Sequence, residues 1–245
     1  MQRQYSGTLG KTGNCQIATS ITISTRTQHL PVDMDLYLPE SWAEDRARCR
    51  AAHIPDDVGY RPKRRIALDL IERNVAAGVP LGLLLADSAY GDVGAFRDGV
   101  RALDFEYALD VKSHTRVVIV CDDGEETDPM DVETVADIIG AKRYRKVTWR
   151  QGSRRALAAR FATVRVRVVT GRDVRGEEQW LVIERPSRSA PPEHYVLAPL
   201  PKSMSRKELV RRIKQRWRTE RTYEDLKGEL GLDHFEGRTY TGWQH

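Results

Sequence analysis

A stripe of charged residues near the carboxyl end of the chain combines one carboxylate with two cations. Arg216, Glu220 and Lys227 lie at positions i, i+4 and i+11. On a helix with about 3.6 residues per turn, this spacing brings the three side chains within roughly 40° of one another. A carboxylate can bind a divalent cation, and flanking cations can hold phosphate groups. Chemistry on nucleic acid is therefore the first hypothesis, with a surface ion pair worth about 0.3 kcal/mol as the alternative.

A second carboxylate, Asp87, follows a nearly continuous apolar run over residues 79–86. Such a run is typical of a strand that is covered on both faces. A carboxylate at the carboxyl end of a buried strand lies where α/β proteins bind ligands, and it can hold a divalent cation there. The alternative is an aspartate that ends the strand and caps the following helix. The residues alone leave both roles open.

Longer runs of sequence around these residues resemble one protein family. In chain order, the runs are residues 3–16, 36–42, 86–91, 216–238 and 242–245. Together they resemble bacterial insertion-sequence transposases of the DDE, ribonuclease-H-like superfamily, and within it the 701 group. The resemblance covers nearly the whole chain, and runs of this length are much more specific than the spacing of three charged residues.

The resemblance implies roles for individual residues. Asp87 and Glu220 match the second and third metal-binding carboxylates of the family, and Arg216 and Lys227 match cations that grip DNA phosphates. Trp217 is the tryptophan best placed to stack on a DNA base, whereas packing is the commoner role of tryptophan. In the family, two Mg²⁺ or Mn²⁺ ions about 3.5–4 Å apart activate the attacking oxygen and stabilise the leaving oxygen of a phosphodiester.

The chain departs from the family pattern at three places. The first catalytic Asp of the family lies on a strand before the block that matches residues 3–7, and it has no counterpart here. Ile213 replaces a tyrosine, and relatives continue beyond His245. We therefore expect a transposase fragment that is truncated at both ends and catalytically inactive. The alternative is a non-catalytic DNA-binding or dimer-poisoning remnant of a decayed element.

The predicted fold class is α/β. The resemblance implies a ribonuclease-H-like mixed sheet with flanking helices, interrupted by a β-rich insertion and without its first central strand. We expect residues 1–116 to form the first part of the catalytic core, residues 117–200 the insertion, and residues 201–245 the helical end of the core.

Apolar spacing and breaker residues predict the individual elements. We expect a hairpin over residues 15–24 and 30–38, a helix over 42–52 with Ser41 as its N-cap, and a helix over 63–77 with Gly78 as its C-cap. A β-α-β unit is expected over residues 79–111. Short strands are expected over residues 145–149, 161–169, 179–183 and 195–198.

Valines alternate with Arg165 and Arg167 along the expected strand over residues 161–169. The valines then face one side of the sheet and the arginines the other. We interpret the arginines as exposed charges on the solvent face. A strand that lies along DNA is the alternative.

The charge balance suits an anionic partner without defining one. The formal net charge is +5, from 40 basic and 35 acidic residues. The basic residues concentrate in runs over residues 61–65, 142–146, 154–155 and 202–221. A modest excess of this kind supports binding to nucleic acid but does not identify a function.

Cysteine usage and hydropathy point to the cytoplasm. The three cysteines are far apart and show no metal-binding spacing, and no apolar run reaches the length of a membrane span. With the resemblance, we expect a nucleoid-associated bacterial protein that does not enter membranes. Its expected partners are double-stranded DNA, at transposon ends and target sites, and further copies of itself on that DNA.

Overall fold

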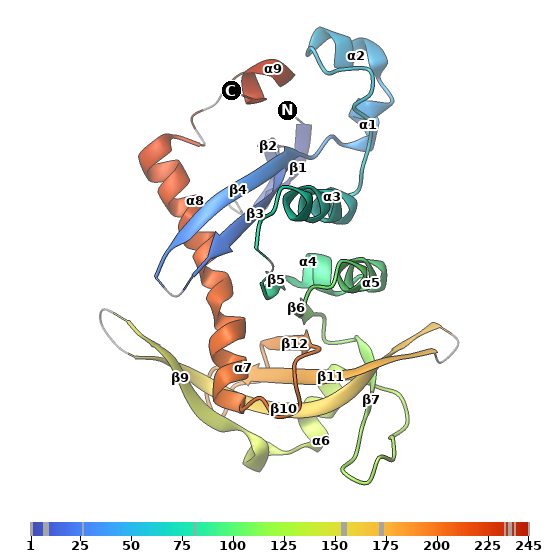
Figure 1. Cartoon of the computed structure of the whole chain (residues 1–245), viewed down its shortest axis with the longest axis vertical. Coiled ribbons are helices and arrows are strands. Elements are labelled where there is room, and N and C mark those ends of the chain that lie inside the picture. The colour runs from blue at the N-terminus through green and yellow to red at the C-terminus, as the bar shows by residue number, and fades with distance from the viewer. Residues whose placement is uncertain are drawn as a thin grey trace. The chain divides into compact units, whose positions relative to one another are not determined.

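Two units make up the chain in the computed structural model (Figure 1). Unit 1 combines Met1–Pro80 with Trp217–His245, and unit 2 is Leu81–Arg216. The structure describes residues 2–6, 10–25, 27–80, 82–152, 156–171, 174–232, 234, 237 and 239–244. The basic residues Arg154 and Arg155 lie outside the described residues.

Unit 1 contains two antiparallel hairpins and helices from both ends of the chain. The hairpins are β1 (Gln2–Ser6) with β2 (Lys11–Cys15) and β3 (Ala18–Ser24) with β4 (His29–Leu36). The helices are α1 (Glu40–Ala43), α2 (Arg46–Ala51), α3 (Lys63–Ala76), α8 (Trp217–Leu230) and α9 (Tyr240–Gln244). The β3–β4 hairpin confirms the prediction, whereas the sequence did not predict β1 and β2.

Helix α3 follows the predicted bounds closely. Its apolar residues Ile66, Leu70 and Ile71 are buried. At its end, the Gly78 N–H donates to Val75 O (2.9 Å) and the Val79 N–H donates to Asn74 O (3.0 Å), which is the hydrogen-bond pattern of a Schellman motif. Gly78 has a φ of +79°, which favours glycine, so the predicted C-cap is confirmed.

The helix predicted over residues 42–52 is instead two short helices. α1 begins after Pro39, and α2 begins after Asp45, whose side chain accepts a hydrogen bond from the Arg48 N–H at 2.9 Å. This capping bond satisfies an early N–H donor of α2 and favours an interruption of the helix before it. Ser41 is therefore not the N-cap, and it exchanges hydrogen bonds with Gln2.

Unit 2 is built on one mixed sheet. Its strand order is β5 (Leu84–Ala86), β6 (Tyr107–Val111), β12 (His194–Ala198), β11 (Val174–Arg185), β10 (Ala156–Thr170), β7 (Arg116–Ile119) and β8 (Met130–Asp131), and β9 (Arg145–Gln151) also pairs with β10. β5 and β6 are parallel, and the other pairs are antiparallel. The structure thus confirms the predicted α/β class and each of the short strands.

Helices cover the sheet of unit 2. They are α4 (Ser88–Gly91), α5 (Gly94–Ala102), α6 (Val132–Ile138) and α7 (Arg206–Ile213), with the 3-10 turns η1 (Ala141–Arg143) and η3 (Lys214–Arg216). Leu181 and Ile183 pack in one apolar cluster with α6, whereas Val182 packs in a second cluster with α7. This alternation along β11 shows that the middle of the sheet is buried on both faces.

The β-rich segment expected over residues 117–200 belongs to the same sheet as β5 and β6. The connection is made by β12, which pairs with β11 on one side and with β6 on the other. The three-part division of the chain over residues 1–116, 117–200 and 201–245 stays a prediction.

The strand before Asp87 is shorter than predicted. Among the described residues of the apolar run over 79–86, only Leu84–Ala86 form a strand, and these three residues are half-buried. Val79 gives its N–H to the end of α3, and Pro80 has no N–H to donate to a sheet. Among the described residues β5 pairs only with β6, so the expectation of a long strand covered on both faces is wrong.

The predicted exposure of Arg165 and Arg167 is also wrong. The Arg165 Nε lies 2.9 Å from Glu178 Oε1, and its guanidinium carbon lies 4.7 Å from the centre of the Trp180 ring. The Arg167 Nε lies 3.0 Å from Glu126 Oε1. The exposed fraction is 16% for the Arg165 side chain and 34% for that of Arg167, so both arginines are partly buried in ion pairs and do not form an open cationic face.

Candidate functional site

Asp87 lies where β5 ends and α4 begins. Its backbone is extended, and its Oδ1 accepts a hydrogen bond from the Ala89 N–H at 3.0 Å. Asp87 is therefore the N-cap of α4, as one of the two alternatives from the sequence stated. The residue is exposed, and a carboxylate has four lone-pair positions, so capping does not exhaust its ability to accept bonds.

Gly91 and Arg97 fix the turn that presents Asp87. A Cβ at Gly91 would lie 2.0 Å from Asp110 O and 2.8 Å from Leu109 Cβ, so α4 packs directly on β6. The buried Arg97 donates from Nη1 to Gly91 O at 2.5 Å. This contact satisfies a carbonyl at the end of α4. The block over residues 86–91 is thus a tight strand-to-helix turn.

Asp110 is level with Asp87 on the neighbouring strand. Ala86 pairs with Leu109 in the parallel register. Asp87 and Asp110 are the residues that directly follow this pair, one on each chain segment, near the carboxyl ends of β5 and β6. The Asp110 Oδ2 lies 3.4 Å from His194 Nδ1. This hydrogen bond raises the pKa of His194 and outweighs burial, which lowers it.

A second ion pair lies beside His194. Glu184 is the cross-strand partner of His194 in the sheet, and its Oε2 lies 2.5 Å from Lys214 Nζ. Sequence reasoning missed this group of charges. The pairing of β11 with β12 brings Glu184 and His194 together, and the sequence of either strand alone does not reveal this pairing.

The charged stripe predicted near the carboxyl end of the chain extends over two elements, the 3-10 turn η3 and the helix α8. Arg216 lies in the 3-10 turn η3, whereas Glu220 and Lys227 lie in α8. The prediction of one regular helix is therefore wrong for Arg216, because the turn before α8 is wound more tightly. Trp217 is half-buried, and the Arg218 guanidinium carbon lies 5.0 Å from the centre of its ring.

The two predicted metal ligands belong to different units, Asp87 to unit 2 and Glu220 to unit 1. Both carry oxygen ligands, which suit a hard divalent cation. In the part of the chain that the structure describes, however, no group of three His, Cys, Asp or Glu side chains could hold a metal ion. The assignment of Asp87 and Glu220 as the two metal ligands stays a prediction.

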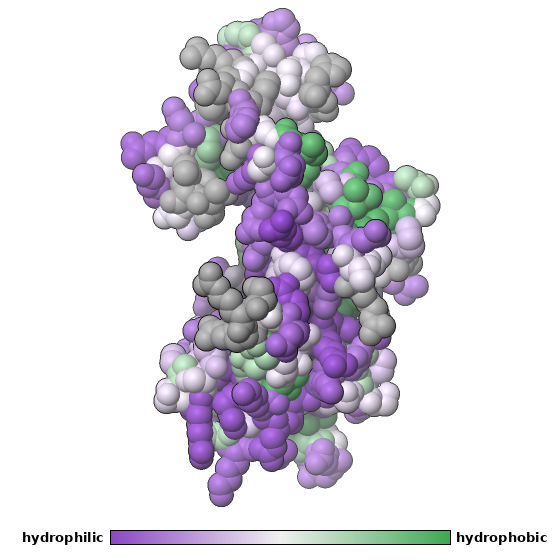
Figure 2. All heavy atoms as spheres, turned by 90° about the vertical axis from the view of Figure 1, so that its left-hand side faces the viewer, coloured by the Kyte–Doolittle hydropathy of each residue, from purple (hydrophilic) through white to green (hydrophobic). Residues whose placement is uncertain are grey.

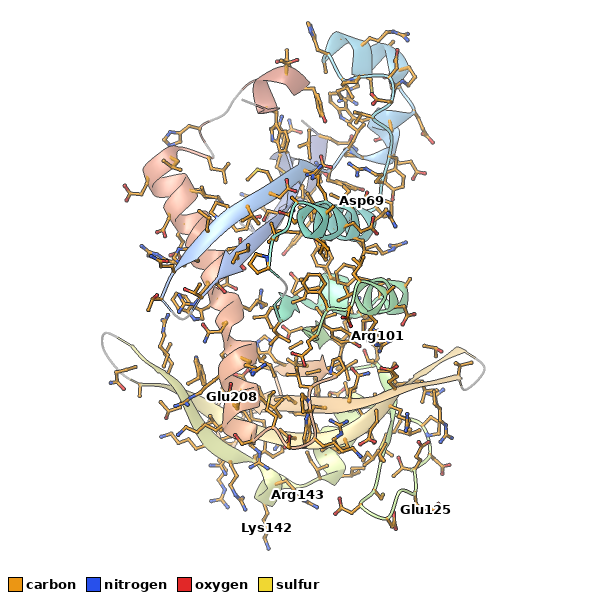
Figure 3. The ribbon with its side chains drawn as sticks, viewed as in Figure 1. Asp69, Arg101, Glu125, Lys142, Arg143 and Glu208 are labelled. Carbon is orange, nitrogen blue, oxygen red and sulfur yellow. The ribbon has the colours of Figure 1, made fainter. Side chains whose placement is uncertain are left out.

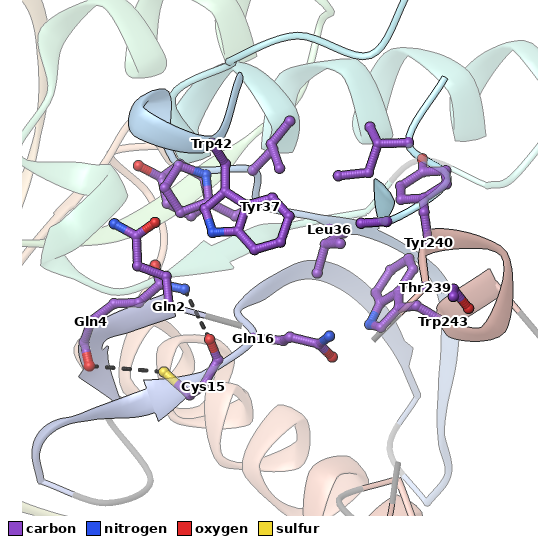
Figure 4. A pocket seen from close by; sticks show the side chains of 14 residues that line it. Gln2, Gln4, Cys15, Gln16, Leu36, Tyr37, Trp42, Thr239, Tyr240 and Trp243 are labelled. Atoms are coloured by element: carbon purple, nitrogen blue, oxygen red, sulfur yellow. Dashed lines mark hydrogen bonds between the residues drawn. The ribbon is translucent and has the colours of Figure 1, made fainter. Parts of the chain in front are cut away.

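A pocket in unit 1 is lined by none of the predicted site residues (Figure 4). It encloses about 460 Å³, including space open to solvent. Glutamines and aromatic residues dominate its walls, among them Gln2, Gln4, Gln16, Trp42, Tyr240 and Trp243. Gln4 Nε2 donates to Cys15 O at 3.1 Å, so part of this wall is fixed by the β1–β2 hairpin.

None of the helices that the structure describes is both long enough and apolar enough to cross a membrane.

Asp92, which follows α4, is held by structural contacts: its Oδ1 accepts a hydrogen bond from Thr115 Oγ1 at 2.9 Å. Burial raises the pKa of Asp92, but hydrogen bonds from Thr115 and the Lys112 backbone outweigh it, and the net pKa is lowered. Asp92 is therefore a structural carboxylate, unlike the exposed Asp87.

Comparison with known proteins identifies a family for this chain. The family model described as "DDE superfamily endonuclease" matches residues 1–156, a stretch that contains Asp87 and ends before Arg216, Glu220 and Lys227. A curated relative, "Probable transposase for insertion sequence element IS701" of Microchaete diplosiphon, is 31% identical over 121 residues. This match covers 49% of the present chain and 29% of the relative. Because the family match extends over more than half of the chain, this protein belongs to the DDE superfamily endonucleases.

Proposed function

We propose that this chain is the catalytic-core segment of a DNA transposase of a bacterial insertion sequence. The observation that carries the proposal is the position of Asp87. It lies inside the family match and at the carboxyl end of β5, where the tight turn into α4 presents an exposed carboxylate. The printed name of the Microchaete diplosiphon relative supports the same function.

The proposed core is ribonuclease-H-like. The parallel pair β5 and β6, joined through α4 and α5, supports this assignment. The strands from β7 to β12 would then form the insertion expected over residues 117–200, which shares a sheet with β5 and β6. A central strand that bears the first carboxylate has no counterpart by resemblance.

The reaction proposed for the intact transposase is phosphodiester cleavage and strand transfer at the ends of the insertion sequence. Members of this superfamily generally use divalent metal ions. Asp87 and Glu220 carry the oxygen ligands that Mg²⁺ and Mn²⁺ prefer. Arg216 and Lys227 would hold DNA phosphates by charge-assisted hydrogen bonds, and Trp217 would contact a base.

The 245-residue polypeptide is proposed to bind double-stranded DNA without cutting it, because the resemblance supplies two of the three family carboxylates. Assembly of several copies on DNA and association with the nucleoid are part of the proposal. A DNA-binding or dimer-poisoning remnant is the second candidate, and it shares the cationic residues around Arg216.

Binding to duplex DNA tests the proposed roles of these residues. We expect the double variant Arg216→Ala/Lys227→Ala to bind more weakly than the parent chain, with a salt slope reduced by about two, since each phosphate contact contributes roughly 0.9 to that slope. Fluorescence anisotropy over a salt series measures both quantities. Glu220→Gln should bind at least as well as the parent chain, because it removes a negative charge near the phosphates.

A second glutamate of α8 provides the control for this experiment. Glu229→Gln is the matched control for Glu220→Gln, because Glu229 is exposed on the same helix. If Arg216→Ala/Lys227→Ala binds DNA with the parent affinity and the parent salt slope, the proposed phosphate contacts are wrong.

A further inference from the structure

Three arginines of unit 2 come together at the end of the sheet where β9 begins. Arg143 ends η1, Arg145 begins β9, and Arg206 begins α7, which packs against β9. Burial lowers the pKa of Arg206, and the charges of Arg145 and Arg143 lower it further. Because α7 packs against β9 and η1 directly precedes β9, the three arginines lie in the same part of unit 2.

These three arginines have no acidic partner among the residues that the structure describes. No Asp or Glu oxygen of the described chain lies within 4.0 Å of a guanidinium nitrogen of Arg143, Arg145 or Arg206. Four other arginines of unit 2 are paired with acidic residues: Arg165 with Glu178, Arg167 with Glu126, Arg185 with Asp137 and Arg212 with Glu208.

The cluster also contains an unsatisfied donor. The Nε of Arg206 is buried and has no hydrogen-bond partner among the residues that the structure describes. Arg206 is the first residue of α7, and Ser205 caps that helix by accepting from the Glu208 N–H at 3.2 Å. The positive end of the helix dipole therefore adds to the charge of the guanidinium groups.

The surroundings are exposed and cationic. Lys142, Arg143, Arg145 and Lys146 are all exposed, and Lys142 and Arg143 project away from the sheet in Figure 3. Hydrophilic side chains dominate the face of unit 2 seen in Figure 2. Uncompensated like charges reduce the stability of a fold, and a polyanion relieves that cost. Duplex DNA carries one negative charge per about 1.7 Å of its axis.

We propose that Lys142, Arg143, Arg145 and Arg206, the cationic patch, hold the phosphate backbone of duplex DNA. This inference rests on the proposed function for the identity of the polyanion, and it adds a DNA contact surface apart from Arg216 and Lys227. The patch consists of exposed and half-buried cationic side chains, which can neutralise phosphates of the DNA backbone. Contacts of this kind with phosphates carry no sequence information, so we expect binding there to be independent of DNA sequence.

The test is a salt titration with a random-sequence duplex in EDTA, so that binding is measured apart from any metal-dependent chemistry. For Arg143→Gln/Arg145→Gln we expect the Kd to rise roughly tenfold and the slope of log K against log salt to fall by about two. Arg143→Gln alone should lower the slope by about one. Because Arg143 is exposed, this single variant keeps the test independent of folding defects.

The matched control removes the same charge elsewhere. Arg64 and Arg188 are exposed and lie outside the patch, so Arg64→Gln/Arg188→Gln controls for the change in net charge. If the patch variants and this control show the same Kd and slope, the inference is overturned while the proposed function stands. If the parent chain does not bind duplex DNA at low salt, the DNA partner itself is wrong and both proposals fall.

Discussion

At the scale of single residues, Gly91 shows how the backbone around Asp87 is fixed. Its Cα faces Asp110 O and Leu109 Cβ so closely that no Cβ fits without a shift of β6 or α4. Both neighbours belong to a strand in the sheet, so neither can move freely. Close packing of α4 on β6 therefore explains why glycine occupies position 91, independently of any family resemblance.

Gly91→Ala is predicted to lower the free energy of unfolding by about 2 kcal/mol, as overpacking of a tight core contact does. Urea denaturation monitored by circular dichroism measures the change. Gly94→Ala is the matched control, because its Cβ would lie 3.6 Å from the flexible end of Arg97. Equal stability of Gly91→Ala and the parent chain would show that α4 does not pack on β6 in this way.

The pair of His194 and Asp110 predicts a pH dependence of stability. Asp110 raises the pKa of folded His194 above its unfolded value, and the neighbouring Glu184 acts in the same direction while Lys214 opposes it. The stabilisation is therefore fully present below the unfolded pKa, about 6.5, and is lost as the pH rises through the folded pKa.

Asp110→Asn should accordingly flatten the fall in Tm that the parent chain shows as the pH rises above about 6.5. Differential scanning calorimetry from pH 5.5 to 8.5 measures it. Asp122→Asn is the control, since Asp122 is exposed in the loop that follows β7. An unchanged profile in Asp110→Asn would rule out the ion pair as a source of the pH dependence.

At the scale of elements, α8 is tied to the β3–β4 hairpin by side chains from opposite ends of the chain. The hydroxyl groups of Tyr223 and Ser20 are hydrogen-bonded, and His29 Nε2 lies 2.9 Å from Asp225 Oδ2. The hydrogen bond from His29 is the largest cause of the lowered pKa of Asp225. Unit 1 therefore depends on both of its sequence segments.

Tyr223→Phe is expected to cost about 1 kcal/mol of stability, the usual net value of one hydrogen bond. A double-mutant cycle with Ser20→Ala isolates the interaction, because the second mutation should then cost little more. Tyr5→Phe serves as the control, since 64% of Tyr5 is exposed. Additive effects of the two substitutions would show that the hydroxyl groups do not interact.

The elements that the sequence predicted share a clear local signal. α3 has apolar spacing and a glycine at its end, and the strands of unit 2 show alternation or apolar runs. β1 and β2 were missed because their residues are mostly polar, so only backbone pairing defines them. The ion pair between Arg167 and Glu126 joins residues far apart in sequence, and only the fold brings them together.

At the scale of the whole molecule, the sequence located Asp87 at a strand end but could not place it relative to other strands. The resemblance identified the residues, the register of β5 with β6 adds Asp110 as a neighbour, and the pairing of β12 adds His194. The roles of Asp87 and Glu220 as metal ligands stay predictions, since they rest on resemblance and belong to different units.

The cleavage of DNA tests the central claim, that this polypeptide is a transposase core segment which binds DNA without cutting it. Supercoiled plasmid carrying the insertion-sequence ends is incubated with the protein in Mg²⁺ or Mn²⁺, and nicked product is measured after the protein is removed. The account predicts retarded but uncut plasmid. Metal-dependent nicking that Asp87→Asn abolishes and Asp122→Asn preserves would contradict it, and would show a complete active site.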